Sequence, residues 1–390
     1  MLKLTLDLSR STARRRPLIG GTLLGVLALL AIQSPASAQG LEKDTRPPIA
    51  PDIREDKLDI KLQRGDFVAV PIPLSNPTLG SGLIGGAAYF YPQTEEQKAA
   101  QPASLTGIAG MYMDNDSKAL AIAQQNYWNN NQWRFTGAVG AADLRLSLLS
   151  ADENGTGIDL DWRLKGTFAF ARLSGQVRKG WYAGALARLV DVDQSIEGSF
   201  DPGASEILTL PGIRSAGVGA YLEYDTRDMP TNAFSGRYFK VDALFNDEAI
   251  GSDNTYQNYS FVFNTYQQKS DSLVLAWQVQ GCLRGGDVPL WDACTIKLRG
   301  FSATDFIGTG SMSGQVEGRW RLNERWGLVG FAGGGYARDV FSDIDNREWI
   351  PSYGVGLRFM VLKSKRVNMR LDYARSSNSD AIHFMVGEAF

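Results

Sequence analysis

The sequence contains a single histidine, His383, and only two cysteines, Cys282 and Cys294, in 390 residues. A hydrolase triad needs a histidine between a nucleophile and an orienting acid, and the chain has no G-x-S-x-G motif to supply that nucleophile. A tetrahedral metal site needs a cluster of ligands, which two separated cysteines and one histidine do not make. We therefore expect no enzyme activity, no catalytic residues, no metal site and no cofactor.

Clustered basic charge is also scarce beyond the first forty residues. Residues 1–38 carry five Lys or Arg and one Asp, so without them the formal net charge falls from −2 to about −6. A mildly acidic chain whose basic residues are scattered lacks the basic patch of a nucleic-acid-binding protein. We expect no nucleic-acid partner.

The first 38 residues are predicted to be a signal peptide. Arg14, Arg15 and Arg16 precede an apolar run at 18–32, and a small-residue cleavage site follows at 35–38. This order is typical of secretory signal peptides. A plain secretory signal fits the sequence better than a twin-arginine signal does. The next segment, 39–65, is rich in proline and charge and is predicted to be a short periplasmic segment.

No apolar run after the signal is long enough for a membrane-spanning helix, and strict alternation of apolar and polar residues recurs instead. It is clearest at 158–168 (IDLDWRLKGTF), 313–322 (SGQVEGRWRL) and 367–373 (VNMRLDY). A period of two predicts strands with one apolar and one polar face. In all three we expect the apolar residues to face lipid and the polar residues to face a wet lumen.

Two features favour a membrane barrel over the alternative, a secreted soluble β protein. The polar faces carry charges of both signs, such as Arg370 and Asp372 on one strand. Aromatic residues gather near predicted strand ends, as in the girdles of outer-membrane barrels. These are Tyr89, Phe90, Tyr91, Tyr127, Trp128, Trp181, Tyr182, Trp326 and Phe390. The predicted fold is all-β, a transmembrane antiparallel β-barrel of the outer-membrane type.

Turn signals divide the barrel domain, 66–390, into about sixteen strands, an even number as bacterial barrels require. Short turns alternate with longer connections, which are predicted at 193–212, 247–254, 283–310 and 338–351. An even strand count places both chain ends on one side of the outer membrane, which we expect to be the periplasmic side. Pro71 and Pro73 make the first strand an irregular or edge strand.

The two cysteines lie in one predicted loop region of a secreted chain. An oxidising compartment favours a disulfide between Cys282 and Cys294, and two unpaired thiols are the alternative.

Six segments of the chain, taken in order, resemble one known family. They are YLEYDTRDMPTNAFSGRYFKVD (221–242), LRGF (298–301), GLVGFAGGG (327–335), YGVGLRF (353–359), MRLDYA (369–374) and HFMVGEAF (383–390). Together they resemble the C-terminal barrel of the BamA/TamA superfamily, the bacterial surface antigen family, over about 213–390. The family usually has periplasmic domains before its barrel, which the 27 residues at 39–65 are too few to form, so the resemblance implies a barrel-only branch.

The resemblance implies sixteen strands and a role in outer-membrane protein assembly or protein translocation. It implies outer-membrane lipid, a client polypeptide and the host's barrel-assembly machinery as partners. A passive channel or a structural surface barrel is the alternative. The final segment implies an assembly signal formed by Phe384, Val386, Gly387 and Phe390, in which both phenylalanines and Val386 face lipid.

The family also implies roles for the sixth extracellular loop. Leu298, Arg299, Gly300 and Phe301 match its motif, in which the arginine turns into the lumen, and Glu317 matches an acidic partner. The chain departs from the pattern at Gly333, where the family usually has a second acidic partner. Asp339 or Asp343 is a candidate to replace it.

Two further matches are expected to be structural. Asp225, Arg227 and Asp228 match a periplasmic turn that the arginine stabilises, and His383 is expected to face the lumen.

Overall fold

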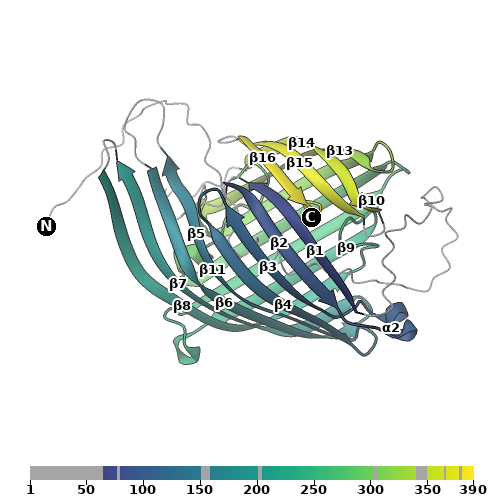
Figure 1. Ribbon diagram of the computed structural model, residues 1–390, viewed down its shortest axis with the longest axis horizontal. Helices are drawn as coiled ribbons and strands as arrows, with labels where there is room; N and C mark the ends of the chain where they lie inside the picture. The colour runs from purple at the N-terminus through teal and green to yellow at the C-terminus, as the bar shows by residue number, and fades with distance from the viewer. Residues whose placement is uncertain are drawn as a thin grey trace.

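The computed structural model describes residues 65–76, 80–150, 159–200, 204–301, 306–339, 349–363, 366–376 and 380–390. The predicted signal peptide and residues 39–64 of the short segment lie outside this range. Sixteen antiparallel strands form a closed barrel in which each strand pairs with its neighbours in sequence and β1 meets β16 (Figure 1). The predicted strand number and all-β class are therefore confirmed. Among the described residues, no helix has the length and hydropathy needed to cross a membrane.

The strands are β1 (Asp66–Asn76), β2 (Gly80–Phe90), β3 (Leu105–Met113), β4 (Lys118–Trp128), β5 (Trp133–Ser150), β6 (Asp159–Arg178), β7 (Trp181–Phe200), β8 (Ala204–Asp225), β9 (Gly236–Asn246), β10 (Tyr256–Gln268), β11 (Leu273–Gly286), β12 (Gly308–Arg321), β13 (Trp326–Asp339), β14 (Ile350–Leu362), β15 (Val367–Ser376) and β16 (Asp380–Val386). The described connections contain three short helices: α2 (Glu95–Ala100), η1 (Glu248–Ile250) and η2 (Leu290–Asp292). The turn end of the barrel is the end where β1 begins and β16 ends, and the loop end is opposite.

One predicted loop is in fact a strand pair. The region 193–212 continues the ladder of β7 and β8, from Gln194 opposite Leu210 to Phe200 opposite Ala204. The turn signal of this hairpin is Asp201-Pro202-Gly203 in the sequence, and alternation extends on both sides of it. Strands β5 to β8 consequently have 18 to 22 residues, about twice the length that crosses a bilayer.

Near the loop end, these long strands place apolar side chains inside the barrel and charged side chains outside, which reverses the predicted arrangement. One orientation prediction was therefore wrong. Trp162 and Leu164 of β6 are buried inside the barrel instead of facing lipid. Arg163 lies on the outer face, where it donates to Asp143 at 2.8 and 2.7 Å and to Glu197 at 3.4 Å. Beyond the hydrocarbon band the outer face meets water, so charge belongs outside there and apolar side chains inside. The other two alternating segments have the predicted orientation: Trp320 and Leu371 face outward, and Glu317 and Asp372 face inward.

The predicted aromatic girdle is only partly present. Tyr89, Tyr91, Trp128 and Trp326 are exposed on the outer surface, as expected. Tyr127 and Tyr182 are instead buried, because the alternation of β4 and β7 turns them into the barrel. The hydroxyl of Tyr182 donates to the main-chain oxygen of Asn131 at 2.9 Å.

Part of the barrel interior is filled by apolar side chains rather than by water. The main cluster takes inward-facing residues from β1 to β3 and from β5 to β7: Leu74, Ile84, Met111, Met113, Leu144, Leu146, Trp162, Leu164, Val190 and Val192. Leu290 and Trp291, from the connection between β11 and β12, pack against this cluster. That connection, 287–307, is called loop six below, and its described residues are 287–301 and 306–307. The apolar residues of loop six thus anchor the loop within the lumen.

Candidate functional site

The guanidinium of Arg299 in loop six lies inside the barrel and reaches two strand carboxylates. It donates to Glu317 of β12 at 2.5 Å and to Asp372 of β15 at 3.0 Å. It also donates to the amide oxygen of Gln315 at 3.1 Å, and it stacks 3.4 Å from the ring centre of Phe331. Arg299 is 7% exposed and both carboxylates are 0% exposed, so this is a buried ion network.

Each of the two carboxylates is shared with a second arginine. Glu317 accepts from Arg319 at 2.6 Å, and Asp372 accepts from Arg358 at 2.5 Å. Removing one member of such a network leaves an uncompensated buried charge, which costs far more than an exposed pair is worth. The network therefore fixes the tip of loop six to the wall between β12 and β15.

The other residues of the predicted loop motif also contact the wall. Leu298 and Phe301 are buried in a cluster with Ile296. Gly300 has a φ of +86°, and a Cβ there would lie 3.2 to 3.3 Å from main-chain atoms of β15. Glycine suits this position because it adopts positive φ without strain and because the loop passes so close to the strand. The main-chain nitrogen of Gly300 lies 3.5 Å from Nε2 of His383, which faces the lumen from β16.

The second acidic partner of Arg299 is Asp372, although we had named Asp339 and Asp343 as candidates. Asp343 and the side chain of Asp339 lie outside the described residues. The sequence already indicated the position of Asp372, because the alternation that it shares with Arg370 places it in the lumen. Gly333 leaves no room for a side chain: a Cβ there would lie 2.3 Å from the main-chain oxygen of Gly314.

A second anchor of loop six was not recognised in the sequence. The carboxylate of Asp292, in η2, accepts hydrogen bonds from both terminal nitrogens of Arg188 on β7. It also accepts from the hydroxyl of Tyr256 at 2.9 Å and from the amide of Asn258 at 2.7 Å. No motif marks Asp292, because its partners come from strands distant in sequence. Loop six is therefore held near its base as well as at its tip.

A disulfide fixes the same base. Cys282, on β11, is bonded to Cys294, with 5.7 Å between the Cα atoms. The bridge ties the start of loop six to the strand from which it leaves.

The last four residues turn into the lumen, which corrects the predicted position of Phe390. Phe384 and Val386 follow the outward alternation of β16, opposite Leu371 and Met369 of β15. Gly387 then adopts a φ of +97°, which breaks the alternation. As a result Phe390 faces the interior, where its ring lies 6.3 Å from that of Tyr266.

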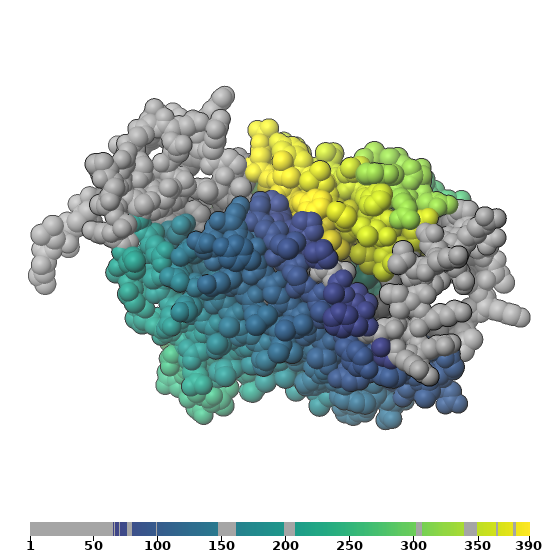
Figure 2. Space-filling view, viewed as in Figure 1, coloured from purple at the N-terminus to yellow at the C-terminus, as the bar shows by residue number. Residues whose placement is uncertain are grey.

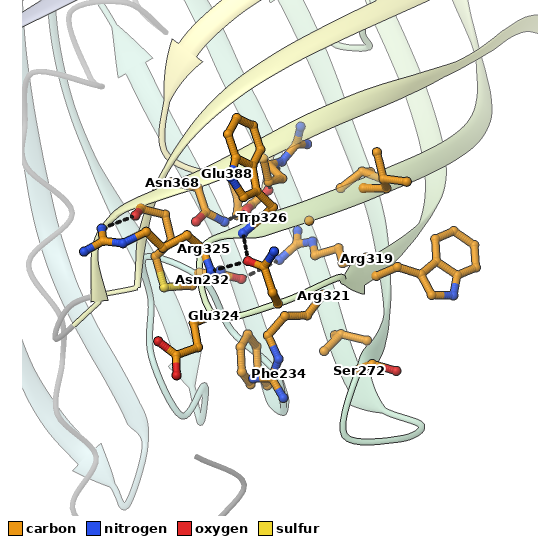
Figure 3. Close-up of a pocket in the computed structure, with 18 of the residues that line it drawn as sticks. Asn232, Phe234, Ser272, Arg319, Arg321, Glu324, Arg325, Trp326, Asn368 and Glu388 are labelled. Carbon is orange, nitrogen blue, oxygen red and sulfur yellow. Dashed lines mark hydrogen bonds and ion pairs between the residues drawn. The ribbon is translucent and has the colours of Figure 1, made fainter. Parts of the chain in front are cut away.

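This terminal segment, 387–390, contacts the arginines that share carboxylates with Arg299. Glu388 accepts from Arg358 at 2.9 Å and from Asn368 at 2.5 Å. The main-chain oxygen of Phe390 accepts from Arg319 at 2.8 Å. Figure 3 shows Arg319, Asn368 and Glu388 lining a pocket at the turn end of the barrel, together with Phe234 and Trp326. The loop-six tip and the terminal segment are thus linked through shared charges.

The two phenylalanines are expected to differ in their effect on assembly. If the assembly signal is read on the outer face, Phe384→Ala should lower the amount of folded, heat-modifiable barrel in the outer membrane several-fold. Phe390→Ala should leave that amount closer to the wild-type level, because its ring lies inside. The measurement is a gel-shift assay on heated and unheated membranes. A larger loss for Phe390→Ala would show that the lumen contacts are what assembly requires.

The predicted turn arginine is satisfied within its own turn. Arg227 donates to Asp225 at 3.0 and 2.8 Å, while Asp228 accepts at 2.6 Å from Arg366, in the turn between β14 and β15. At the same rim Lys363 hydrogen-bonds Glu324 at 2.7 Å, and this contact lowers the pKa of the glutamate. Within the described part of the chain, no group of three or more His, Cys, Asp or Glu residues could hold a metal ion.

The seam between the first and last strands is the weakest junction of the barrel. Along the described residues, β1 and β16 have one aligned pair, Ser75 opposite Phe384. By contrast, β1 pairs with β2 along its whole length, from Asp66 to Asn76. Figure 2 shows the N-terminal strands in purple lying against the C-terminal strands in yellow on one face. Pro71 and Pro73 have no N–H, so neither can donate a hydrogen bond to a neighbouring strand.

A closed sixteen-strand antiparallel barrel, with an apolar outer belt and an ion network inside, defines an outer-membrane β-barrel. Solved structures share this fold. BamA from Haemophilus ducreyi lacking POTRA domains 1–3 has a TM-score of 0.56 and 12% identity, with 83% of this chain and 70% of that chain covered. CdiB from Acinetobacter baumannii has a TM-score of 0.52 and 11% identity, with 83% and 60% covered. CdiB from Escherichia coli has a TM-score of 0.54 and 11% identity, with 82% and 62% covered.

This likeness confirms the fold that the sequence resemblance implied. The chain spans about 60% of the length of each CdiB chain. No protein-family model matches the sequence, and no curated protein sequence matches it.

Proposed function

We propose that the chain assists the assembly or translocation of other polypeptides at the outer membrane, without catalysing a chemical reaction. Its two chain ends would lie on the periplasmic side. The observation that carries the proposal is the seam, in which the described residues form one aligned strand pair, Ser75 and Phe384, next to a docked loop six. BamA and CdiB, whose fold it shares, give the proposal its direction.

The seam offers a physical route for a client strand. A strand edge whose N–H and C=O groups are unpaired is a template for another strand. Proline at 71 and 73 limits what β1 can donate, and β16 has only seven residues. Opening such a junction therefore breaks few hydrogen bonds.

Loop six supports the inner side of this junction. Its tip contacts β15 through Asp372 and approaches β16 at His383. A client that separates β16 from β1 would disturb these contacts. Conversely, release of Arg299 would free β15 and β16 to move.

The alternative function is a passive channel or a structural surface barrel. The observation that favours it is the second anchor: Asp292 and the Cys282–Cys294 disulfide hold loop six in place without Arg299. A loop fixed at two points suits a permanent plug better than a moving one.

Depletion of the protein in its host distinguishes the two functions. Under the proposed function, a subset of outer-membrane or secreted proteins should fall several-fold in a quantitative outer-membrane proteome. Re-expression of the wild-type chain should restore them. An unchanged proteome, together with changed uptake of small solutes, would support the passive channel instead.

A further inference from the structure

Lys297 is an unusual cation in the lumen. It lies in loop six, two residues before Arg299, and its main-chain oxygen accepts from Gln280 of β11 at 2.5 Å. It is therefore inside the barrel, yet its side chain is exposed. A side chain that is exposed within a barrel faces lumen water, so a wet space remains beside this part of loop six.

The carboxylates around this space already have cationic partners. Asp242 of β9 pairs with Lys240 at 3.0 Å and accepts from Ser260 at 2.7 Å. Asp292 is shared by two arginines, Arg188 and Arg284. No described carboxylate forms an ion pair with Lys297. This side of the lumen therefore has more positive than negative charge.

Arg172 adds a second cation without a described acidic partner. It projects inward from β6, and its guanidinium lies 5.8 Å from the ring centre of Tyr221 on β8. Arg172 lies on the same face of β6 as Trp162 and Leu164, whose side chains are buried inside the barrel, so it also points inward. It also lies 6.0 Å from the ring centre of Phe170.

The sign of this region opposes that of the whole chain, whose formal net charge is −2. Charges that line a confined low-dielectric passage focus the local field and raise the concentration of counter-ions there. Rings of Arg and Lys select anions in pores for this reason. Charges that are paired with an opposite charge contribute little to the net field in the passage. Lys297 and Arg172 should therefore dominate the ion selectivity.

We propose that the space between loop six and the wall formed by β6 and β8 to β11 is an anion-selective passage. It would take small inorganic anions such as chloride, drawn by Lys297 and Arg172. The inference goes beyond the proposed function, because it concerns ions and needs no polypeptide client.

The test is a reversal-potential measurement on the purified full barrel in planar bilayers under a tenfold KCl gradient. The wild-type barrel should favour chloride over potassium. Lys297→Glu and Arg172→Glu should each lower the chloride-to-potassium permeability ratio at least threefold, and the double variant should favour potassium. Lys165→Glu is the matched control. It makes the same charge change on an exposed outer position of β6, so it should leave the ratio unchanged.

If the wild-type barrel conducts, either of two results would overturn the proposal. One is a wild-type barrel that prefers potassium or shows no preference. The other is a Lys297→Glu variant that behaves like the Lys165→Glu control. If the wild-type barrel passes no current, Arg299→Ala, which frees the tip of loop six, should pass chloride. A variant that also passes none would show that no passage exists.

Discussion

A disulfide across the seam should abolish the proposed protein-handling activity. Ser75 and Phe384 are an aligned pair of β1 and β16, and directly opposed residues of antiparallel strands lie at distances that a disulfide can bridge. In the depleted host, a Ser75→Cys, Phe384→Cys chain should leave client levels as low as depletion does. Reduction of the new bond should restore them to the level that the Phe384→Cys single variant supports. The measurement is the outer-membrane proteome before and after reduction.

The matched control closes the adjacent junction instead. Ser75→Cys with Ser81→Cys links β1 to β2, where Ser75 and Ser81 are also an aligned pair. This variant has the same number of added cysteines but leaves the seam free, so it should restore client levels. The single variants Ser75→Cys and Phe384→Cys report any effect of the substitutions themselves. If the seam variant is fully active while oxidised, the client does not enter between β1 and β16.

Removing the Glu317 carboxylate should release the tip of loop six. Arg299 and Arg319 share the Glu317 carboxylate, which is 0% exposed. Glu317→Ala therefore leaves both arginines without this partner. Breaking a buried pair by removing one partner costs about 3–5 kcal/mol, whereas a solvated pair is worth about 1 kcal/mol or less. The sequence predicted a wet lumen, in which the smaller value would apply, but the burial of this network indicates the larger one. Trypsin should cut after Lys297 or Arg299 at least tenfold faster than in the wild type.

A charge exchange tests whether the network acts as a unit. If Arg299 and Glu317 formed an isolated ion pair, Arg299→Glu combined with Glu317→Arg would restore that pair. Here it should fail, because a glutamate at 299 would face Asp372 and an arginine at 317 would face Arg319. As the control, Glu223→Gln removes a carboxylate whose described partners are Arg134 and Tyr238 and not residues of loop six, so trypsin cleavage should stay at the wild-type rate. Wild-type cleavage in Glu317→Ala would mean that Asp292 and the disulfide alone hold the loop.

The strand pattern could be predicted from sequence because it depends on local physics. A strand exposes alternate side chains on opposite faces, so the period of two, the turn residues between strands and the even count follow from the order of residues. The position of Arg299 between strands eleven and twelve came from the same count. Asp372 could also be placed in the lumen, since it alternates with Arg370 on one strand.

The direction in which each face points could not be predicted from alternation alone. Trp162 and Arg163 occupy opposite faces whichever face meets lipid, and only the length of β5 to β8 shows that this part projects beyond the bilayer. Phe390 was placed outward because the alternation was extended past Gly387. The positive φ of that glycine ends the strand and turns the remaining residues inward.

The sequence alone determined the all-β class, the sixteen strands and the loop that carries Arg299, because each depends on residues close together in the chain. The tertiary structure decided which charges meet. Asp292 with Arg188, Asp372 with Arg299, and Glu388 with Arg358 join residues from 30 to 104 positions apart, across a lumen that exists only once the barrel has closed. The narrow seam was likewise decided by closure, because the pairing of β1 with β16 depends on how fourteen intervening strands bring their edges together.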